Sequence, residues 1–201
     1  MVVDREELTT NLTNFYDFSG KTVLYTGCGL GQLLPPQSGV KSVIGIDRDA
    51  KALKAFRDVA KTKWAGIPIK FFPHKFEMVK DHADVAYFEF CMHMMDDPKL
   101  TLNLARALAK DIVVIDHLPG SKWVYYWCGE DEVRRSTRVI ETFHPRRTKQ
   151  LVADQRFSDW NALMKRLDGV EKESERRILE LKGAEDIHIR MDYGLFLLTG
   201  Q

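Results

Sequence analysis

Short apolar runs and amphipathic stretches alternate along most of the chain. The apolar runs predict strands at residues 23–26, 41–47, 67–72, 83–89, 111–116, 177–181 and 193–198. Apolar residues at helical spacing predict helices at residues 4–18, 49–57, 100–109, 129–141 and 157–167. Strands that alternate with helices indicate an α/β fold on a parallel sheet, which the last two strands close as a hairpin.

A glycine-rich turn follows the first of these strands and contains Gly27, Gly29 and Gly31. Glycine lets the backbone approach a ligand because no Cβ atom stands in the way, and a helix behind the turn presents unpaired N–H groups to polar or anionic ligand atoms. We expect that helix to be short or interrupted, because Pro35 and Pro36 follow the turn. The stretch predicts a nucleoside cofactor.

The glycine spacing and one carboxylate indicate which cofactor to expect. Dinucleotide-binding turns follow the pattern G-x-G-x-x-G, whereas Gln32 stands here at the position of the third glycine. Asp47 closes the strand next to the turn, where its carboxylate can accept hydrogen bonds from both hydroxyls of a ribose. A helix cap or a solvent-facing side chain is the alternative role for Asp47. The glycine spacing therefore disfavours NAD as the cofactor, whereas Asp47 still predicts a cofactor that contains a ribose.

From the glycine turn to residue 117, the order and spacing of these motifs resemble class I S-adenosylmethionine-dependent methyltransferases. The resemblance implies a Rossmann-like α/β sheet of seven strands, mostly parallel, with an antiparallel last strand between its neighbours and helices on both faces. It also implies S-adenosylmethionine as cofactor and S-adenosylhomocysteine as product. The cofactor-binding residues that we predict are Tyr25, Gly27, Cys28, Gly29, Asp47, Arg48, Lys75, Phe76, Glu89 and Phe90.

Two positions depart from the family pattern. Tyr25 stands where the family usually has the acid that meets the methionine end of the cofactor, and Lys75 stands where an acid usually meets the adenine amine. Glu89 lies in an apolar run, where a carboxylate is costly unless it is hydrogen-bonded or paired. We expect the sulfonium or the amino group of the cofactor to be its partner, so that Glu89 compensates for one missing acid.

His93 and His117 are the candidate catalytic residues. Each follows a predicted strand, and ligands of open α/β sheets lie outside the carboxyl ends of the strands. A histidine there can take a proton from a substrate nucleophile near neutral pH, or it can simply bond a neighbouring backbone group. Asp116 similarly allows a role at the site or in capping a turn. Methyl transfer mainly requires alignment of donor and nucleophile, so a dedicated base is optional.

Composition limits the class of protein and its partners. The 201 residues, 44% of them hydrophobic, suit a single domain, and we interpret residues 118–155 as an insertion that covers the substrate. The 30 Lys and Arg against 29 Asp and Glu give no support for a nucleic-acid or membrane partner. Three cysteines without a C-x-x-C pair give no metal site and favour a reducing compartment, and the charged amino-terminal residues do not resemble a signal peptide. We expect a cytoplasmic protein.

The acceptor that we predict is a small molecule. Arginines within residues 134–149 suggest an anionic one, although basic residues along a helix that starts with acids also suit the helix dipole. Two other functions fit parts of the sequence. The missing acids at Tyr25 and Lys75 favour a non-catalytic S-adenosylmethionine-binding protein, and an NAD(P)-dependent oxidoreductase requires that Gln32 be tolerated in the turn.

Overall fold

The computed structural model describes residues 2–3, 5–29, 31, 33–127, 129–166 and 177–200. The strands of this part are β1 (Val2–Val3), β2 (Thr22–Thr26), β3 (Ser42–Ile46), β4 (Ile69–Phe72), β5 (Ala83–Glu89), β6 (Ala109–His117), β7 (Arg147–Asp159) and β8 (Glu185–Thr199). The α-helices are α1 (Arg5–Phe15), α2 (Ala50–Lys63), α3 (Pro98–Leu108), α4 (Lys122–Trp127), α5 (Glu130–Thr142) and α6 (Trp160–Arg166). Strands and helices alternate as the hydrophobic pattern predicts.

The strands form one sheet in the order β1-β7-β8-β6-β5-β2-β3-β4. Strands β4, β3, β2, β5 and β6 pair in parallel, while β8 runs antiparallel between β6 and β7. This confirms the predicted Rossmann-like sheet with an antiparallel last strand. The two-residue strand β1 adds to the edge of the sheet by pairing with β7.

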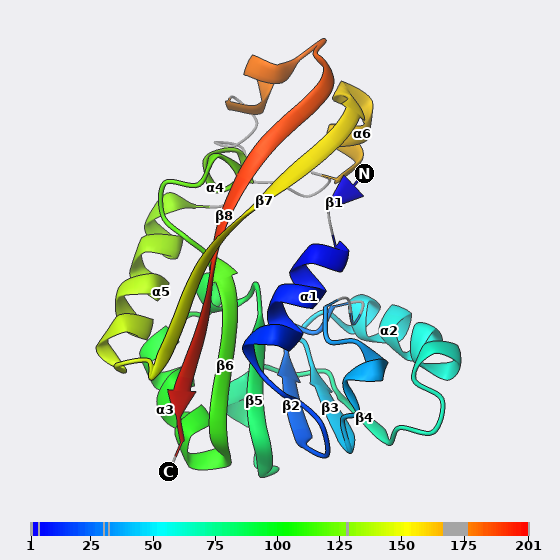
Figure 1. Cartoon of the computed structure of the whole chain (residues 1–201), viewed down its shortest axis with the longest axis vertical. Coiled ribbons are helices and arrows are strands. Elements are labelled where there is room, and N and C mark those ends of the chain that lie inside the picture. The colour runs from blue at the N-terminus through cyan, green and yellow to red at the C-terminus, as the bar shows by residue number, and fades with distance from the viewer. Residues whose placement is uncertain are drawn as a thin grey trace.

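Alternate residues of the parallel strands pack into two cores, one on each face of the sheet. Val23 and Tyr25 pack with buried residues of α1 and α2, whereas Leu24 packs with buried residues of α3 and α5. Figure 1 shows α1 and α2 on one side of the sheet and α3 and α5 on the other. Because both faces are covered, the strands appear in the sequence as nearly continuous apolar runs. The prediction of helices on both faces is confirmed.

The second half of the chain corrects three predictions. Residues 147–155, predicted within the substrate cover, belong to β7, which pairs with β8 along its length. That strand was missed because its first four residues are all exposed and polar. Residues 177–181 are helical rather than a strand. Helix α6 begins at Trp160, because the residues just before it complete β7.

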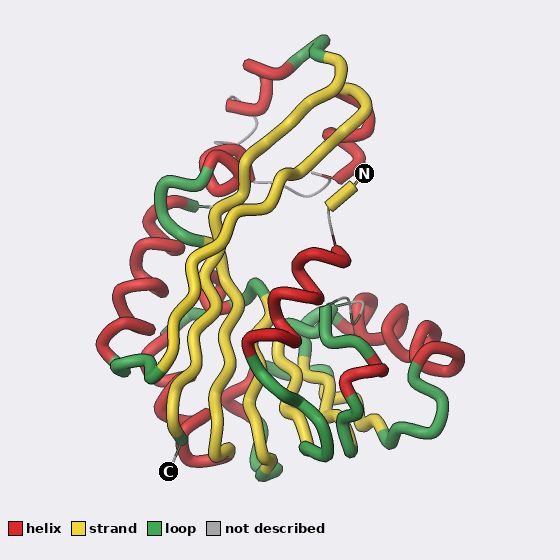
Figure 2. Tube along the Cα trace, viewed as in Figure 1, coloured by secondary structure: helices red, strands yellow, loops and turns green. Residues whose placement is uncertain are grey.

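Strands β7 and β8 continue beyond the rest of the sheet. Residues 193–199 of β8 pair with β6, whereas residues 185–192 pair only with β7. Figure 2 shows this two-stranded extension above the other strands, with helices at its tip and α1 beside its base. Within the ranges described, no helix is long and apolar enough to cross a membrane.

Candidate functional site

A pocket opens at the carboxyl ends of β2, β3 and β5 and beside the 3₁₀ turn that follows β4. Its lining includes residues from each strand end and from the loops between them: Thr26, Gly27, Ile46, Asp47, Arg48, His74, Lys75, Phe76, Glu77, Glu89, Phe90, Cys91, Met94, Met95 and Asp96. This is the edge of an open α/β sheet at which ligands bind. Seven of the ten residues predicted to bind the cofactor line this pocket, and the other three are Tyr25, Cys28 and Gly29.

The glycine turn after β2 forms one wall of the pocket. Gly27 has a φ of 64°, and a Cβ atom there would lie 2.5 Å from the Cβ of Cys91. Gly29 has a φ of 46°. Both conformations favour glycine, and the missing side chains keep the turn thin beside the pocket. Cys28 is buried, with its thiol packed toward Gly45, so its side chain points into the core rather than the pocket.

The turn does not lead into an α-helix. Residues 36–38 form a 3₁₀ turn instead, with Pro36 at its first position. Among the described residues, the helix expected behind the glycines, which the two prolines were predicted to shorten or interrupt, is thus reduced to this single 3₁₀ turn, because proline lacks an N–H donor and disfavours helical backbone in the residue before it. Gln32, on which the comparison with dinucleotide turns depends, lies outside the described residues.

Asp47 follows β3 and joins the two loops on this side of the pocket. Its Oδ2 accepts a hydrogen bond from the backbone N–H of Gly29 at 3.0 Å, and its Oδ1 accepts one from the N–H of Asp49 at 2.9 Å. Asp49 caps helix α2 by accepting from the N–H of Lys51 at 2.8 Å. A carboxylate has about four lone-pair sites, so Asp47 retains acceptor capacity toward the pocket.

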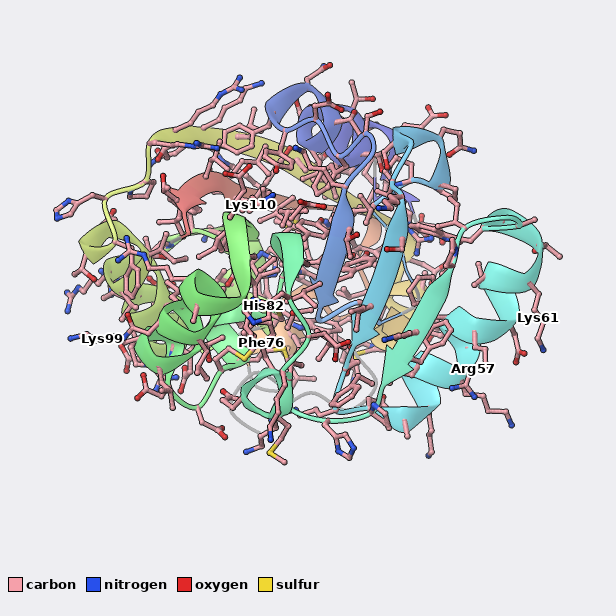
Figure 3. The ribbon with its side chains drawn as sticks, turned by 90° about the horizontal axis from the view of Figure 1, so that it is seen from below. Arg57, Lys61, Phe76, His82, Lys99 and Lys110 are labelled. Atoms are coloured by element: carbon pink, nitrogen blue, oxygen red, sulfur yellow. The ribbon has the colours of Figure 1, made fainter. Side chains whose placement is uncertain are left out.

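Phe76 and Lys75 lie on the turn after β4. Phe76 is buried, and its ring lies 5.1 Å from that of Phe88. Lys75 Nζ pairs with Asp96 Oδ2 at 2.6 Å, and both side chains are more than half exposed. In Figure 3, Phe76 lies in the interior between helices and strands, whereas Lys61 and Lys99 point outward. This end of the pocket combines a buried aromatic ring with an exposed ion pair.

Glu89 ends β5 and lines the other side of the pocket. Two neighbouring side chains, those of Tyr25 and Tyr87, are fully buried. The hydroxyls of both tyrosines donate to Glu89 Oε2, that of Tyr87 at 3.1 Å. Burial raises the pKa of Glu89 to about 7, although these hydrogen bonds act in the opposite direction. Burial and the neighbouring carboxylate also raise the pKa of Tyr25 and Tyr87, so both hydroxyls stay protonated donors.

Phe90 turns the chain sharply after Glu89. It has a φ of 44°, which is uncommon for a residue other than glycine and typical of strained backbone at functional sites. Its N–H donates to the carbonyl of Ile115 at 2.8 Å, which ties the turn to β6. The ring of Phe90 lines the pocket and lies 4.7 Å from the ring of His117. Phe90 therefore connects the pocket to the two candidate catalytic histidines.

His93 and His117 lie together, with ring centroids 5.3 Å apart, and both are buried. Asp116 holds them: its Oδ1 lies 2.7 Å from His93 Nδ1 and accepts from the N–H of His117 at 2.9 Å, while its Oδ2 accepts from the N–H of His93 at 2.9 Å. Burial favours a raised pKa for Asp116, but the adjacent His93 and His117 outweigh it and hold the pKa below its usual value. The ionised Asp116 can only accept, so Nδ1 of His93 carries the proton of their hydrogen bond.

The structure thus brings the predicted residues into two neighbouring groups. One is the pocket, and the other is the cluster of His93, Asp116 and His117 behind Phe90; neither histidine is part of the pocket lining. Sequence reasoning missed Cys91 and Met95 in the lining, whose position so soon after β5 was the available signal. In the described part of the chain, no three His, Cys, Asp or Glu side chains gather in a way that could hold a metal ion.

Residues 24–115 match the family model described as a methyltransferase domain. This part of the chain is similar to a methyltransferase domain, in agreement with the resemblance of the sequence to class I methyltransferases. The family match and the fold support S-adenosylmethionine as the cofactor of this domain, as the sequence predicts. The matched range begins inside β2 and ends inside β6, so it includes the glycine turn and every residue that lines the pocket.

Solved structures share the methyltransferase fold at low sequence identity. The YcgJ protein of Bacillus subtilis has a TM-score of 0.70 at 12% identity, with 98% of this chain and 99% of that chain covered. A SAM-dependent methyltransferase of Aquifex aeolicus has a TM-score of 0.61 at 15% identity, with 98% and 90% covered. Magnesium protoporphyrin IX methyltransferase of Synechocystis PCC 6803, solved with bound SAM, has a TM-score of 0.56 at 14% identity, with 96% and 77% covered. We found no match among curated protein sequences.

Proposed function

We propose that this protein is an S-adenosylmethionine-dependent methyltransferase that acts on a small molecule. The observation that carries the proposal is the pocket between Asp47 and Glu89, at the carboxyl edge of a methyltransferase sheet. When bound, the cofactor supplies an activated methyl group on a sulfonium for displacement by the acceptor. The protein must chiefly hold donor and acceptor in line and exclude water.

The residues of the pocket fit this cofactor. Gly27 keeps the turn open where a Cβ atom would collide with Cys91, and Gly29 fixes Asp47 through its N–H. We assign the ribose hydroxyls to Asp47, because its carboxylate lines the pocket with acceptor capacity to spare. We assign the adenine to the apolar face of Phe76, with Arg48 and Lys75 at the rim of the same end.

Glu89 and Phe90 lie at the donor end of the pocket, and we place the acceptor beyond Phe90, toward His93 and His117. The ionised Asp116 orients the imidazole of His93 through Nδ1, which suits a group that takes a proton from the acceptor. His117, between Phe90 and His93, is the second residue that we assign to the acceptor side. Tyr25 and Cys28 support the site from below.

We further propose that the sheet and its helices form one domain and that residues 118–146 cover the acceptor side. Helix α5 packs against the 3₁₀ turn that carries His93, and its Arg135 donates to the carbonyl of Met95 in the pocket wall at 3.0 Å. Arg134 and Arg146 instead pair with Glu130 and Asp111. Of these three arginines, Arg135 lies at the pocket wall, so the proposal of an anionic acceptor relies on it.

Titration calorimetry with S-adenosylhomocysteine tests the proposal. We expect the wild-type protein to bind one equivalent, and Asp47→Asn to bind about 30-fold or more weakly, because a charged acceptor for two hydroxyls is lost. Asp49→Asn is the matched control: it changes a carboxylate in the same loop but retains a good helix cap, so its affinity should stay within about twofold.

Two results contradict parts of the proposal. A wild-type protein that shows neither binding heat nor a thermal shift with S-adenosylhomocysteine does not use this cofactor. Binding without methyl transfer across a broad panel of small acceptors indicates the non-catalytic alternative, in which the pocket serves recognition only.

A further inference from the structure

Glu89 is a carboxylate that folding has largely removed from water. Glu89 is only 9% exposed to solvent, and it lines the pocket. Over the ranges that the structure describes, no Lys, Arg or His side chain forms an ion pair with it. A buried carboxylate is costly unless donors and a positive charge balance it. Because Glu89 lines the pocket, a ligand bound there can supply this positive charge.

Two tyrosine hydroxyls fix the orientation of this carboxylate. Tyr25 and Tyr87 lie opposite each other in the parallel pair β2 and β5, and their ring centroids are 5.1 Å apart. Both donate to the same oxygen, Oε2 of Glu89. A carboxylate has about four acceptor sites, so it retains capacity for donors from a ligand in the pocket.

We propose that Glu89 is the counter-ion of the α-ammonium group of the cofactor, with Tyr25 and Tyr87 as positioning residues for its carboxylate. The inference rests on the proposed function, since the ammonium belongs to S-adenosylmethionine. An ammonium carries three N–H donors, whereas a sulfonium has none, so the ammonium satisfies both the charge and the hydrogen-bonding capacity of Glu89. The negative charge thus comes from β5, while β2 contributes Tyr25 where the family usually has an acid.

The groups around Glu89 leave it as the titrating member of the cluster near neutral pH. Burial raises the pKa of the thiols of Cys28 and Cys91 and of the hydroxyls of Tyr25 and Tyr87, so all four stay protonated. Burial raises the pKa of Glu89 to about 7, while hydrogen bonds from Tyr25, Tyr87 and the backbone of Leu33, and then the charge of Arg5, act in the opposite direction. An ammonium that enters the pocket favours the ionised carboxylate and is in turn held by it.

The test compares two ligands that share the same nucleoside. S-Adenosylhomocysteine has the ammonium, and 5′-methylthioadenosine lacks the whole amino-acid end. In calorimetry at pH 8 with the full chain, we expect Glu89→Gln to weaken S-adenosylhomocysteine about 10- to 100-fold, as for the loss of a charged hydrogen-bond partner. The affinity for 5′-methylthioadenosine should stay within about twofold, because Gln retains the shape of Glu.

Glu180→Gln is the matched control. Glu180 also accepts from two tyrosine hydroxyls, those of Tyr125 at 3.1 Å and Tyr126 at 3.5 Å, but it is exposed and outside the pocket. This variant should leave the affinity for both ligands unchanged. Tyr25→Phe is a second variant, which keeps Glu89 but loses one positioning hydroxyl; we expect about 3- to 10-fold weaker binding of S-adenosylhomocysteine alone.

The outcomes separate this inference from the proposed function. If Glu89→Gln and Tyr25→Phe both leave S-adenosylhomocysteine binding intact, the inference is overturned and the proposed function stands. If the variants weaken both ligands equally, Glu89 shapes the nucleoside site and is not the counter-ion of an ammonium. If the wild-type protein binds neither ligand, the proposed function fails and takes the inference with it.

Discussion

The two ends of the pocket use carboxylates in opposite ways. At the β3 end, Asp47 is held by two backbone N–H groups in a half-buried loop, beside the exposed pair of Lys75 and Asp96. At the β5 end, Glu89 is buried and receives phenol hydroxyls, which bring no positive charge. The comparison teaches that position at a strand end does not fix the role of an acid. The first suits neutral hydroxyls, and the second suits a cation.

The histidine cluster beyond the β5 end gives the largest effect that we expect. His93→Gln should lower the turnover number about 100-fold or more, because it removes the oriented proton acceptor, while S-adenosylhomocysteine binds as before. His117→Gln should have a smaller effect. A methyl-transfer assay with separate kcat and KM values measures this once an acceptor is found, with exposed His82→Gln as control.

A loss of cofactor binding in His93→Gln that equals its loss of turnover would contradict this assignment. It would show that His93 holds the β5 end of the pocket together through Asp116 rather than acting on the acceptor. Thermal unfolding of the variant distinguishes a damaged fold from a damaged site.

The next largest effect that we expect is a pH dependence of ligand binding that differs between the β3 and β5 ends of the pocket. The raised pKa of Glu89, about 7, means that the free protein carries a largely neutral carboxyl at pH 6 and an ionised one at pH 8. The affinity for S-adenosylhomocysteine should therefore rise about tenfold from pH 6 to pH 8, as the ionised fraction rises. The affinity for 5′-methylthioadenosine, which depends on the β3 end, should stay level. Calorimetry across this range measures both.

The same pKa has a consequence for the stability of the free protein. Because the folded pKa of Glu89 lies above its ordinary value of 4.5, this group contributes to stability below that value, and the contribution is lost as the pH rises through about 7. Glu89→Gln removes this pH dependence of stability.

The binding prediction has its own contradicting outcome. If the affinity for S-adenosylhomocysteine does not change with pH in either the wild type or Glu89→Gln, the β5 end of the pocket is not pH-sensitive.

The smallest effect should come from Lys75 at the β3 end. Lys75→Ala removes an ion pair whose two side chains are more than half exposed, and such pairs contribute little. We expect the affinity for both ligands to change by less than about threefold. A large loss for both in calorimetry would show that Lys75 contacts the nucleoside directly and that the rim is a binding element.

Much of the fold and part of the site could be predicted from the sequence. Strands β2, β3, β5 and β6 are buried on both faces, so their apolar runs stand out, and Gly27 and Asp47 mark two adjacent strand ends. Strand β7 could not be predicted, because its outer residues are exposed at the edge of the sheet and polar. An exposed edge strand has no hydrophobic pattern to distinguish it from a loop.

The contacts of Tyr25 show another limit. Its hydroxyl reaches Glu89, which lies 64 positions later, only because β2 and β5 pair in a register that sets Tyr25 opposite Tyr87. The sequence indicates that Glu89 needs a partner, but strand register is a tertiary property. The bond between His93 and Asp116 depends in the same way on the pairing of β5 with β6.

A crystal structure of the complex with S-adenosylhomocysteine at pH 8 tests the central claim most directly. We predict the ribose hydroxyls within hydrogen-bond distance of the Asp47 carboxylate and the ammonium nitrogen within hydrogen-bond distance of Glu89. The homocysteine sulfur should then lie near Phe90, on the side of His93 and His117. A ligand that binds with its amino-acid end away from Glu89, or outside this pocket, would contradict the account.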